Sequence, residues 1–241
     1  MKEIIERLRN DQDYYGDYGK QWLSNSQIGT LLSNPKEFGR DNMSENANLL
    51  LGRFFHVAML EPHKLGEFDI VEASTRNTNI YKEQAGDRFL LLQKEVDSLM
   101  YGINQMKGNK EMASQIYAEG NQYEVPMIDE FFGVPFKGKA DIVTNEKIID
   151  IKTTSNIAKF RQSAKIYNYD SQAFIYSSMF GLPFEFFVID KSTRQMGIYT
   201  CSEEFLERGM QKVAQAVEVY NKFFGPNATE DVKKYVAHQV L

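Results

Sequence analysis

The chain has 241 residues, of which 42% are hydrophobic and 25% are charged, and its formal net charge is −5, a composition typical of a soluble globular protein long enough for one sizeable core. No apolar run reaches the roughly 18 residues of a membrane helix, and the charged first ten residues lack the apolar centre of a secretory signal, so we expect a cytoplasmic protein without a membrane partner. One cysteine, Cys201, and three histidines exclude an internal disulfide or a cysteine-clustered zinc or iron–sulfur site and disfavour a histidine-rich zinc site.

The first 48 residues predict short helices joined by polar loops. We expect a helix over residues 2–10, a loop rich in Tyr, Gly and Asp over 11–20, and a second loop over 39–48. Between the loops, residues 27–32 predict a helix that Ser26 caps and that Asn34-Pro35 ends. Because a helix N-terminus also binds phosphate, a contact to a DNA end is a second interpretation of Ser26.

Residues 47–60 predict a strong helix, which Glu61-Pro62 ends. Arg53 and His56 are three positions apart and therefore share a face of this helix. Without further information, a lone histidine in such a helix is more often a core residue than a ligand.

The next stretch continues the helical half. Residues 63–80 predict strand and loop, with an extended part over 68–71, and residues 81–117 predict helix with an interruption near Gly108-Asn109. The leucines and methionines of this stretch are most simply core residues.

Two strands over residues 136–143 and 147–153, joined by a turn-forming pair, are the predicted centre of the fold. Side chains alternate along a strand, so Asp150 and Lys152 share one face, and hairpin pairing can bring Asp141 beside Asp150. Two carboxylates and one ammonium group are thus expected to converge on a rigid support.

An earlier strand over residues 123–128 carries Glu124, which we expect to be a third carboxylate beside Asp141. Asp129-Glu130 is predicted to turn the chain into a strand that begins near Phe132.

In the C-terminal part we expect a loop with a helical turn over residues 156–165 and a helix over 170–179, which Gly181-Leu182-Pro183 ends. A strand hairpin over 184–190 and 195–200 and a last helix over 203–224 follow. Gln172 and Tyr176 share a face of the first helix. A helical half followed by a β-β-β-α-β-β order and a closing helix predicts an α/β (α+β) fold in which helices flank a mixed central sheet. We expect one domain over 1–241, with a mainly helical part (1–120), the catalytic sheet and its helices (121–225) and a tail (226–241).

These residue types suit the hydrolysis of a phosphodiester, which needs an activated water and relief of negative charge. Carboxylate oxygens prefer hard cations, so we expect Mg²⁺, or Mn²⁺ as a substitute, as one or two ions. The candidate ligands are the side chains of His56, Glu124, Asp141 and Asp150 and the backbone carbonyl of Ile151. Lys152 is assigned to orienting the water and stabilising charge, since a lysine with its ordinary pKa of about 10.4 is a poor base.

Residues 133–165 carry seven basic side chains against three acidic ones. This local excess of four positive charges is compatible with phosphate contacts, although a solvated strand surface explains it equally well. The candidates for DNA contacts are Ser24, Ser26, Arg53, Lys137, Lys139, Thr153 and Thr154.

Several of these motifs, taken together, resemble the PD-(D/E)xK nuclease superfamily, and in particular its RecE-like (exonuclease VIII) branch, related to lambda exonuclease and the RecB nuclease domain. The motifs are Gly138-Lys139-Ala140-Asp141, Ile149-Asp150-Ile151-Lys152-Thr153-Thr154 and Gln172-x-x-x-Tyr176. Leu51-Gly52-Arg53-Phe54-Phe55-His56 with Leu60-Glu61-Pro62, and Leu23-Ser24-x-Ser26 followed by Ser33-Asn34-Pro35, are similar to N-terminal motifs of that branch. Ala140 stands where the superfamily's name has proline, which leaves the Asp141 ligand intact.

The resemblance implies a Mg²⁺-dependent exodeoxyribonuclease that degrades double-stranded DNA from its ends, 5′ to 3′, in a bacterial cytoplasm if the gene is carried by a phage. It also implies a homo-oligomeric ring (trimer or tetramer) and a single-strand annealing recombinase as partner. It places metal ligands at His56, Glu124, Asp141 and Asp150, the catalytic lysine at Lys152, and DNA-lining, site-supporting roles at Gln172 and Tyr176. The acidic net charge of the chain departs from what wrapping DNA would require.

Two alternatives share this fold, a DNA endonuclease and a non-catalytic DNA-binding or assembly protein. A third, unrelated protein with a merely solvated charged hairpin would leave the conjunction of His56, Glu124, the two strands and Gln172 to coincidence.

Overall fold

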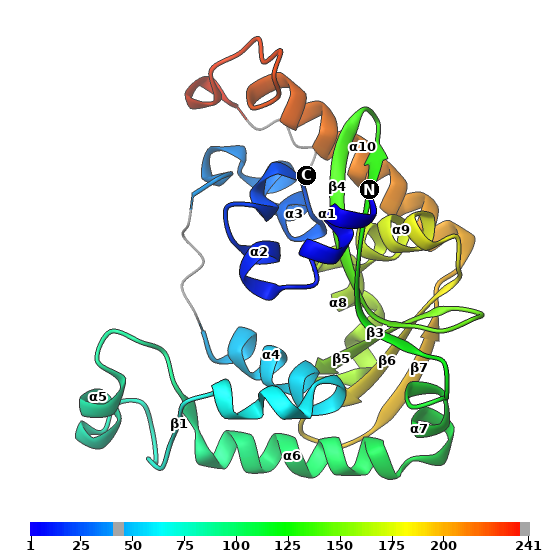
Figure 1. Ribbon diagram of the computed structural model, residues 1–241. Coiled ribbons are helices and arrows are strands. Elements are labelled where there is room, and N and C mark those ends of the chain that lie inside the picture. The colour runs from blue at the N-terminus through cyan, green and yellow to red at the C-terminus, as the bar shows by residue number, and fades with distance from the viewer. Residues whose placement is uncertain (41–45, 237–241) are drawn as a thin grey trace.

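The computed structural model describes residues 1–40 and 46–236. Its first half is mainly helical, as predicted, with two short strands (Figure 1). The helices are α1 (Lys2–Arg7), α2 (Asp11–Tyr15), α3 (Asn25–Ser33), α4 (Ala47–Leu60), α5 (Asn79–Ala85), α6 (Gln93–Gly108) and α7 (Lys110–Ile116). The short strands β1 (Ile70–Val71) and β2 (Leu91–Leu92) pair in parallel, and 3₁₀ turns lie at Gly19–Gln21, Pro35–Glu37 and Pro62–Glu67.

The second half builds a five-stranded mixed sheet and its covering helices. Its elements are β3 (Gln122–Phe131), β4 (Val134–Val143), β5 (Ile148–Thr154), α8 (Phe160–Ile166), α9 (Tyr169–Phe180), β6 (Phe184–Asp190), β7 (Met196–Thr200) and α10 (Glu203–Phe223), with 3₁₀ turns at Ile157–Lys159 and Val232–Lys234. The strands lie in chain order, and only the β5–β6 pair is parallel, because α8 and α9 carry the chain back between them. The predicted fold class is confirmed, and the predicted order of strands is observed with one additional helix, α8, before α9.

Helices cover both faces of the sheet, α9 and α10 on one side and α4 and α6 on the other (Figure 1). Because side chains alternate along a strand, successive core residues pack on opposite faces of the sheet. On β6, Phe186 and Val188 pack toward α9 and α10, whereas Phe187 and Ile189 pack toward α4 and α6. On β5, Ile149 and Ile151 face α4 and α6. Asp150 and Lys152 therefore point to the side of α9, as the alternation predicted.

Several local predictions are wrong, and each has a physical reason. Residues 11–15 of the predicted 11–20 loop form a helix instead, because the Asn10 side chain accepts a hydrogen bond from the Gln12 amide and starts α2. The cap of α3 is Ser24 rather than Ser26, and Gln27 at the third helical position closes a capping box with it.

The observed strand and helix boundaries differ from the predicted ones at three further places. β3 continues through Asp129 to Phe131, and the turn falls at Phe132 and Gly133, both of which have positive φ (52° and 79°). The predicted helix over residues 81–117 is divided by β2, although its break at Asn109 is confirmed. The helical turn predicted within the loop at 156–165 is longer than expected and forms α8.

The predicted loop at 39–48 falls partly on residues 41–45, which lie outside the described residues. No helix in residues 1–40 and 46–236 is long and apolar enough to cross a membrane.

Candidate metal centre

The β4–β5 hairpin brings two buried carboxylates together, Asp141 from β4 and Asp150 from β5. The ladder pairs Ile142 with Ile149, so the two aspartates follow directly at the end of the pairing. Asp141 Oδ2 accepts a hydrogen bond from the Ile151 amide at 2.9 Å, which replaces a backbone partner that this amide would otherwise need. The predicted convergence of Asp141 and Asp150 is therefore present.

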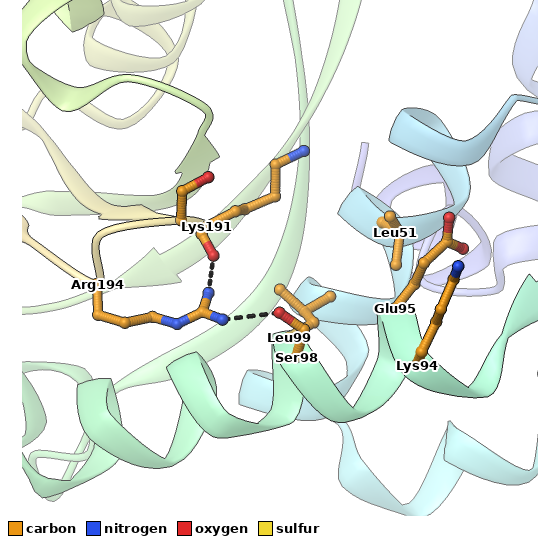
Figure 2. Close-up of a pocket in the computed structure, with 8 residues that line it drawn as sticks. Leu51, Lys94, Glu95, Ser98, Leu99, Lys191 and Arg194 are labelled. Carbon is orange, nitrogen blue, oxygen red and sulfur yellow. Dashed lines mark hydrogen bonds between the residues drawn. The ribbon is translucent and has the colours of Figure 1, made fainter. Parts of the chain in front are cut away.

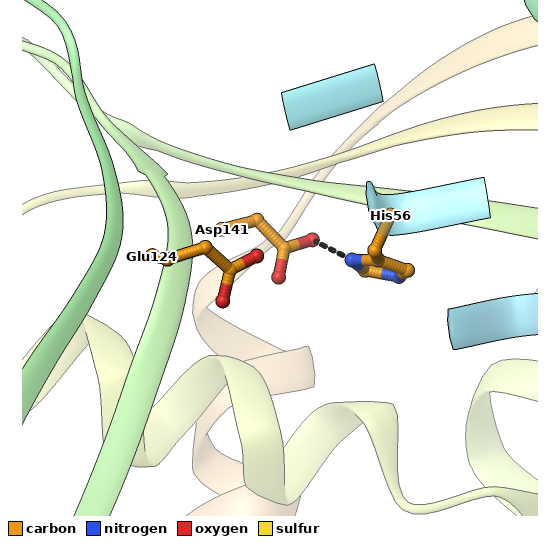
Figure 3. A group of neighbouring side chains, drawn as sticks. All are labelled: His56, Glu124 and Asp141. Atoms are coloured by element: carbon orange, nitrogen blue, oxygen red, sulfur yellow. Dashed lines mark ion pairs between the residues drawn. The ribbon is translucent and has the colours of Figure 1, made fainter. Parts of the chain in front are cut away.

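Helix α4 supplies His56 to the same place. Its Nδ1 lies 3.2 Å from Asp141 Oδ2 (Figure 3). Burial lowers the pKa of His56, but the charge and hydrogen bond of Asp141 outweigh that effect and hold the pKa above its ordinary value. Conversely, burial works to raise the pKa of Asp141, yet His56, Lys152 and the Ile151 amide keep it below its usual value. Asp141 is thus the ionised member of the group.

Glu124 reaches the group from β3 through an unusual backbone conformation. Its φ is 49°, a left-handed value for a non-glycine residue inside a strand. The register passes from the Tyr123–Ile142 pair to the Val125–Ala140 pair, which puts Glu124 opposite Asp141. One ligand atom each from His56, Glu124 and Asp141 lies within 4.8 Å of the others (Figure 3). Burial and the nearby Asp141 charge raise the pKa of Glu124 to about 8.

Asp150 stands beside this group and makes two contacts of its own. Lys152 Nζ lies 2.6 Å from Asp150 Oδ2, and Gln172 Nε2 from α9 donates to Asp150 Oδ1 at 2.6 Å. Burial and the Asp141 charge raise the pKa of Asp150 to about 6. Burial opposes the charged form of Lys152, but Asp150 and Asp141 raise its pKa above the ordinary value, so Lys152 is a cation at neutral pH.

The donor set fits a hard divalent cation. Asp150 Oδ2 is buried, and among the described residues Lys152 Nζ is its polar contact, at 2.6 Å. A carboxylate oxygen with one cationic neighbour keeps lone pairs that a metal ion can occupy. Carboxylates from three strands and one imidazole are ligands that Mg²⁺ and Mn²⁺ accept. We therefore assign Glu124, Asp141 and His56, with Asp150 beside them, as the residues that would hold the ion.

Tyr176 packs behind the site instead of lining an open surface. Its hydroxyl accepts a hydrogen bond from the Lys139 amide at 3.2 Å, and its ring lies against Gly138. A Cβ at Gly138 would meet Tyr176 Cε1 at 2.6 Å, which explains why glycine occupies this point of β4. Tyr176 thereby fixes α9, and with it Gln172, relative to β4.

The seven candidate DNA contacts are not equally placed. Ser24 and Ser26 are adjacent at the start of α3, with hydroxyl oxygens 2.9 Å apart. Arg53 is exposed and lies 3.8 Å from Glu67. Thr153 and Thr154 are partly buried at the C-terminal end of β5.

Lys137 and Lys139 are buried under α2, which removes them from any open phosphate-binding surface. Lys137 donates to the Tyr14 carbonyl, and Lys139 Nζ pairs with Asp11 at 2.6 Å. Burial, followed by the charge of Lys139, lowers the pKa of Lys137 to about 8. Their positive charges hold the N-terminal segment against β4.

Sequence reasoning missed the contribution of α2 to the site. Tyr14 is buried against the two lysines, and Tyr15, which is 70% exposed, lies close enough for Glu124 to influence its pKa. The signal that could have revealed α2 is Asn10 followed by Asp11 and Asp13, a helix start with acidic residues in the first turn. Tyr169 was also missed; its ring centroid lies 5.2 Å from Lys152 Nζ.

Comparisons with known proteins agree with this geometry. A family model described as a PDDEXK-like domain of unknown function (DUF3799) matches residues 31–228. No curated protein matches the chain. A crystal structure of a proposed exonuclease from Eubacterium rectale superposes with a TM-score of 0.66 at 17% identity, covering 96% of this chain and 95% of that one. A phage-related exonuclease from Haemophilus somnus covers 83% of this chain and 94% of its own at 12% identity and a TM-score of 0.37.

The likeness to the Eubacterium rectale structure is one of fold, since the identity is low. The family match extends over most of the chain and includes every residue of the metal group. It also includes the β4–β5 hairpin and α9. The family match supports a nuclease, and the chain belongs to the PDDEXK-like family of the PD-(D/E)xK superfamily.

Proposed function

We propose that this protein is a divalent-metal-dependent exonuclease that degrades double-stranded DNA from its ends, in the 5′ to 3′ direction. The observation that carries the proposal is the group of a buried Asp141 with the half-buried His56 and Glu124, beside the Asp150–Lys152 pair. A bound Mg²⁺ would neutralise phosphate charge and lower the pKa of an attacking water. The exonuclease activity, as opposed to another nuclease activity, is supported by the motif resemblance and by the fold shared with the proposed exonuclease.

The chain's own residues would then orient the reacting groups and stabilise the negative charge that develops on the phosphate. Lys152 remains protonated beside Asp150, so it can donate hydrogen bonds to the water or to a phosphate oxygen and oppose developing negative charge. Gln172 fixes the Asp150 carboxylate from α9. Asp141 is fixed through its Oδ2, which contacts both His56 and the Ile151 amide. Preorganised groups of this kind need little rearrangement during the reaction.

The product of such an enzyme is single-stranded DNA, which suits recombination by strand annealing. We include in the proposal a homo-oligomeric ring and a single-strand annealing recombinase as partner. Both are supported by the motif resemblance alone.

Duplex DNA with one labelled end tests the proposal. The purified protein is incubated with Mg²⁺ and linear duplexes labelled at either the 5′ or the 3′ end, with covalently closed circles as a parallel substrate. We expect immediate release of 5′ label as mononucleotide, late loss of 3′ label and intact circles. Rapid cutting of circles would instead identify an endonuclease, and no cleavage of any substrate with Mg²⁺ or Mn²⁺ would reject catalysis.

A further inference from the structure

A second polar site lies at the tip of the β6–β7 hairpin, where the hairpin meets α4 and α6. The pocket there has a volume of about 380 Å³ and shares no residue with the metal group. In Figure 2, Lys191 and Arg194 approach it from the hairpin, and Lys94 and Glu95 approach it from α6. The lining residues are Leu51, Lys94, Glu95, Ser98, Leu99, Lys191, Ser192 and Arg194.

The pocket carries an excess of positive charge. Among residues 1–40 and 46–236, no carboxylate lies within ion-pair distance of Lys94, Lys191 or Arg194. The one acidic side chain of the lining, Glu95, is already paired with Arg76 at 2.6 Å, and Arg76 lies outside the lining. Three cations therefore line the pocket without an ion pair to any described carboxylate, and of the three only Lys94 has a lining carboxylate, Glu95, on which its charge acts.

Neutral hydrogen bonds hold these cations in place and leave donors free. Lys191 Nζ donates to the Asn48 side chain at 3.2 Å, and Lys94 Nζ donates to the Ser74 carbonyl. Arg194 donates to Ser98 Oγ at 2.7 Å (Figure 2). An ammonium group has three donors and a guanidinium has five, so each cation keeps hydrogens that no described residue accepts. Several fixed cationic donors around one opening suit a phosphate group.

The pocket is joined to the metal centre through β5. The Lys191 amide donates to the Thr154 carbonyl at 2.8 Å. Thr154 lies two residues beyond Lys152 on the same strand, a step of about 7 Å along a β-strand. Leu51 of the pocket and His56 of the metal group also share helix α4. A DNA strand that passes the metal centre can therefore extend to this pocket within a few nucleotides.

We propose that this pocket binds a backbone phosphate of duplex DNA a few nucleotides from the scissile bond. This inference rests on the proposed function, because it takes DNA as the substrate. A free nucleotide offers the same phosphate chemistry, and the experiment below separates the two sources.

The test measures duplex binding at several salt concentrations without divalent metal, by fluorescence anisotropy of a blunt duplex labelled at one end. The variants are Lys191→Gln and Lys94→Gln, which keep a flexible polar side chain, one atom shorter, while removing the charge. The matched control is Lys222→Gln on α10, on the opposite side of the sheet, where Lys222 pairs with the exposed Glu230. Thermal unfolding confirms that each variant is folded. Binding of deoxythymidine 5′-monophosphate is measured in parallel.

We expect each pocket variant to bind the duplex more weakly and to reduce the slope of log affinity against log salt by about 0.9, the value for one lost phosphate contact. Lys222→Gln should match the unmodified protein. Unchanged slopes in both folded pocket variants, or no duplex binding by the unmodified protein, would overturn the inference. So would nucleotide binding that Lys191→Gln abolishes while duplex binding is unaffected. Since binding is measured without metal, a protein that binds as expected but cleaves nothing would refute the proposed function alone.

Discussion

His56 Nδ1 lies 3.2 Å from Asp141 Oδ2, and that same oxygen accepts the amide hydrogen of Ile151 at 2.9 Å. One carboxylate thus joins helix α4, strand β4 and strand β5. Asp141 is buried and ionised, so it supplies fixed negative charge where the three elements meet. The position of every other candidate ligand is set relative to it.

Replacement of Asp141 by asparagine should abolish most of the activity. The amide is neutral, and because His56 and the Ile151 amide both contact Oδ2, an asparagine oxygen at that position turns its NH2 group into the place of Oδ1. An amide nitrogen there donates hydrogens and cannot bind a cation. Loss of a supporting residue around a metal typically costs 10- to 100-fold, so loss of a ligand should reduce the nuclease rate by about 100-fold or more. Rates on linear duplex measure this. A variant that keeps more than half of the activity would remove Asp141 from the site.

Glu124→Gln should separate folding from metal binding. Burial and the Asp141 charge raise the pKa of Glu124 to about 8, so its neutral form predominates near pH 7 and the amide mimics it. We expect an unchanged or higher melting temperature without metal and a much smaller rise on addition of Mn²⁺. Glu130→Gln, an exposed change on the same strand, is the matched control and should respond to Mn²⁺ like the unmodified protein.

Mn²⁺ affinity should rise with pH between about 6 and 8. Below its pKa of about 8, Glu124 holds a proton that the cation must displace, and Asp150 behaves likewise below about 6. His56 also has to lose a proton, because Asp141 raises its pKa. One displaced proton makes the apparent affinity rise up to about tenfold per pH unit. Calorimetry at several pH values measures it. Affinity that is flat with pH, or equally steep in Glu124→Gln, would contradict this assignment.

Lys152→Gln should lower turnover without lowering metal affinity. The raised pKa keeps Lys152 charged, so its contribution is charge stabilisation and not proton abstraction. Removal of one such donor typically costs about 100- to 1000-fold in kcat. Calorimetry with Mn²⁺ should give an affinity equal to or higher than that of the unmodified protein, because a neighbouring positive charge is lost. Parallel loss of metal binding would instead make Lys152 a structural support of the carboxylates.

Gly138→Ala should destabilise the fold. The added Cβ would lie 2.6 Å from Tyr176 Cε1, and the displaced ring supports α9. Overpacking of this kind costs about 1–3 kcal/mol in the free energy of unfolding. Gly52→Ala on α4 is the matched control, since a Cβ there meets nothing within 4 Å and alanine favours a helix by up to about 1 kcal/mol. Denaturant unfolding of both variants should therefore give shifts of opposite sign.

The sequence predicts the central elements well because their signals are local. The bounds of α4 and β6 agree with the predicted ranges 47–60 and 184–190, since Glu61-Pro62 ends the helix and Gly181-Leu182-Pro183 precedes the strand. The opposite orientations of Ile149 and Asp150 follow from strand alternation.

What the sequence does not predict depends on contacts between distant segments. Asp11 lies more than a hundred residues before Lys139, and their ion pair helps hold α2 over β4. No local pattern shows that Lys137 and Lys139 are buried there and do not face DNA. The positive φ of Glu124 is likewise invisible in a strand pattern that fits ordinary pairing. The spacing of Asp141, Asp150 and Lys152 is a local sequence pattern, whereas the contacts around them join segments that are distant in the sequence.

The most direct test of the central claim is anomalous diffraction from crystals grown with Mn²⁺. We expect one anomalous peak within coordination distance of Glu124, Asp141 and His56, and its loss in crystals of Asp141→Asn. A peak elsewhere in the protein with this group left empty, or a peak that survives in Asp141→Asn, would contradict it.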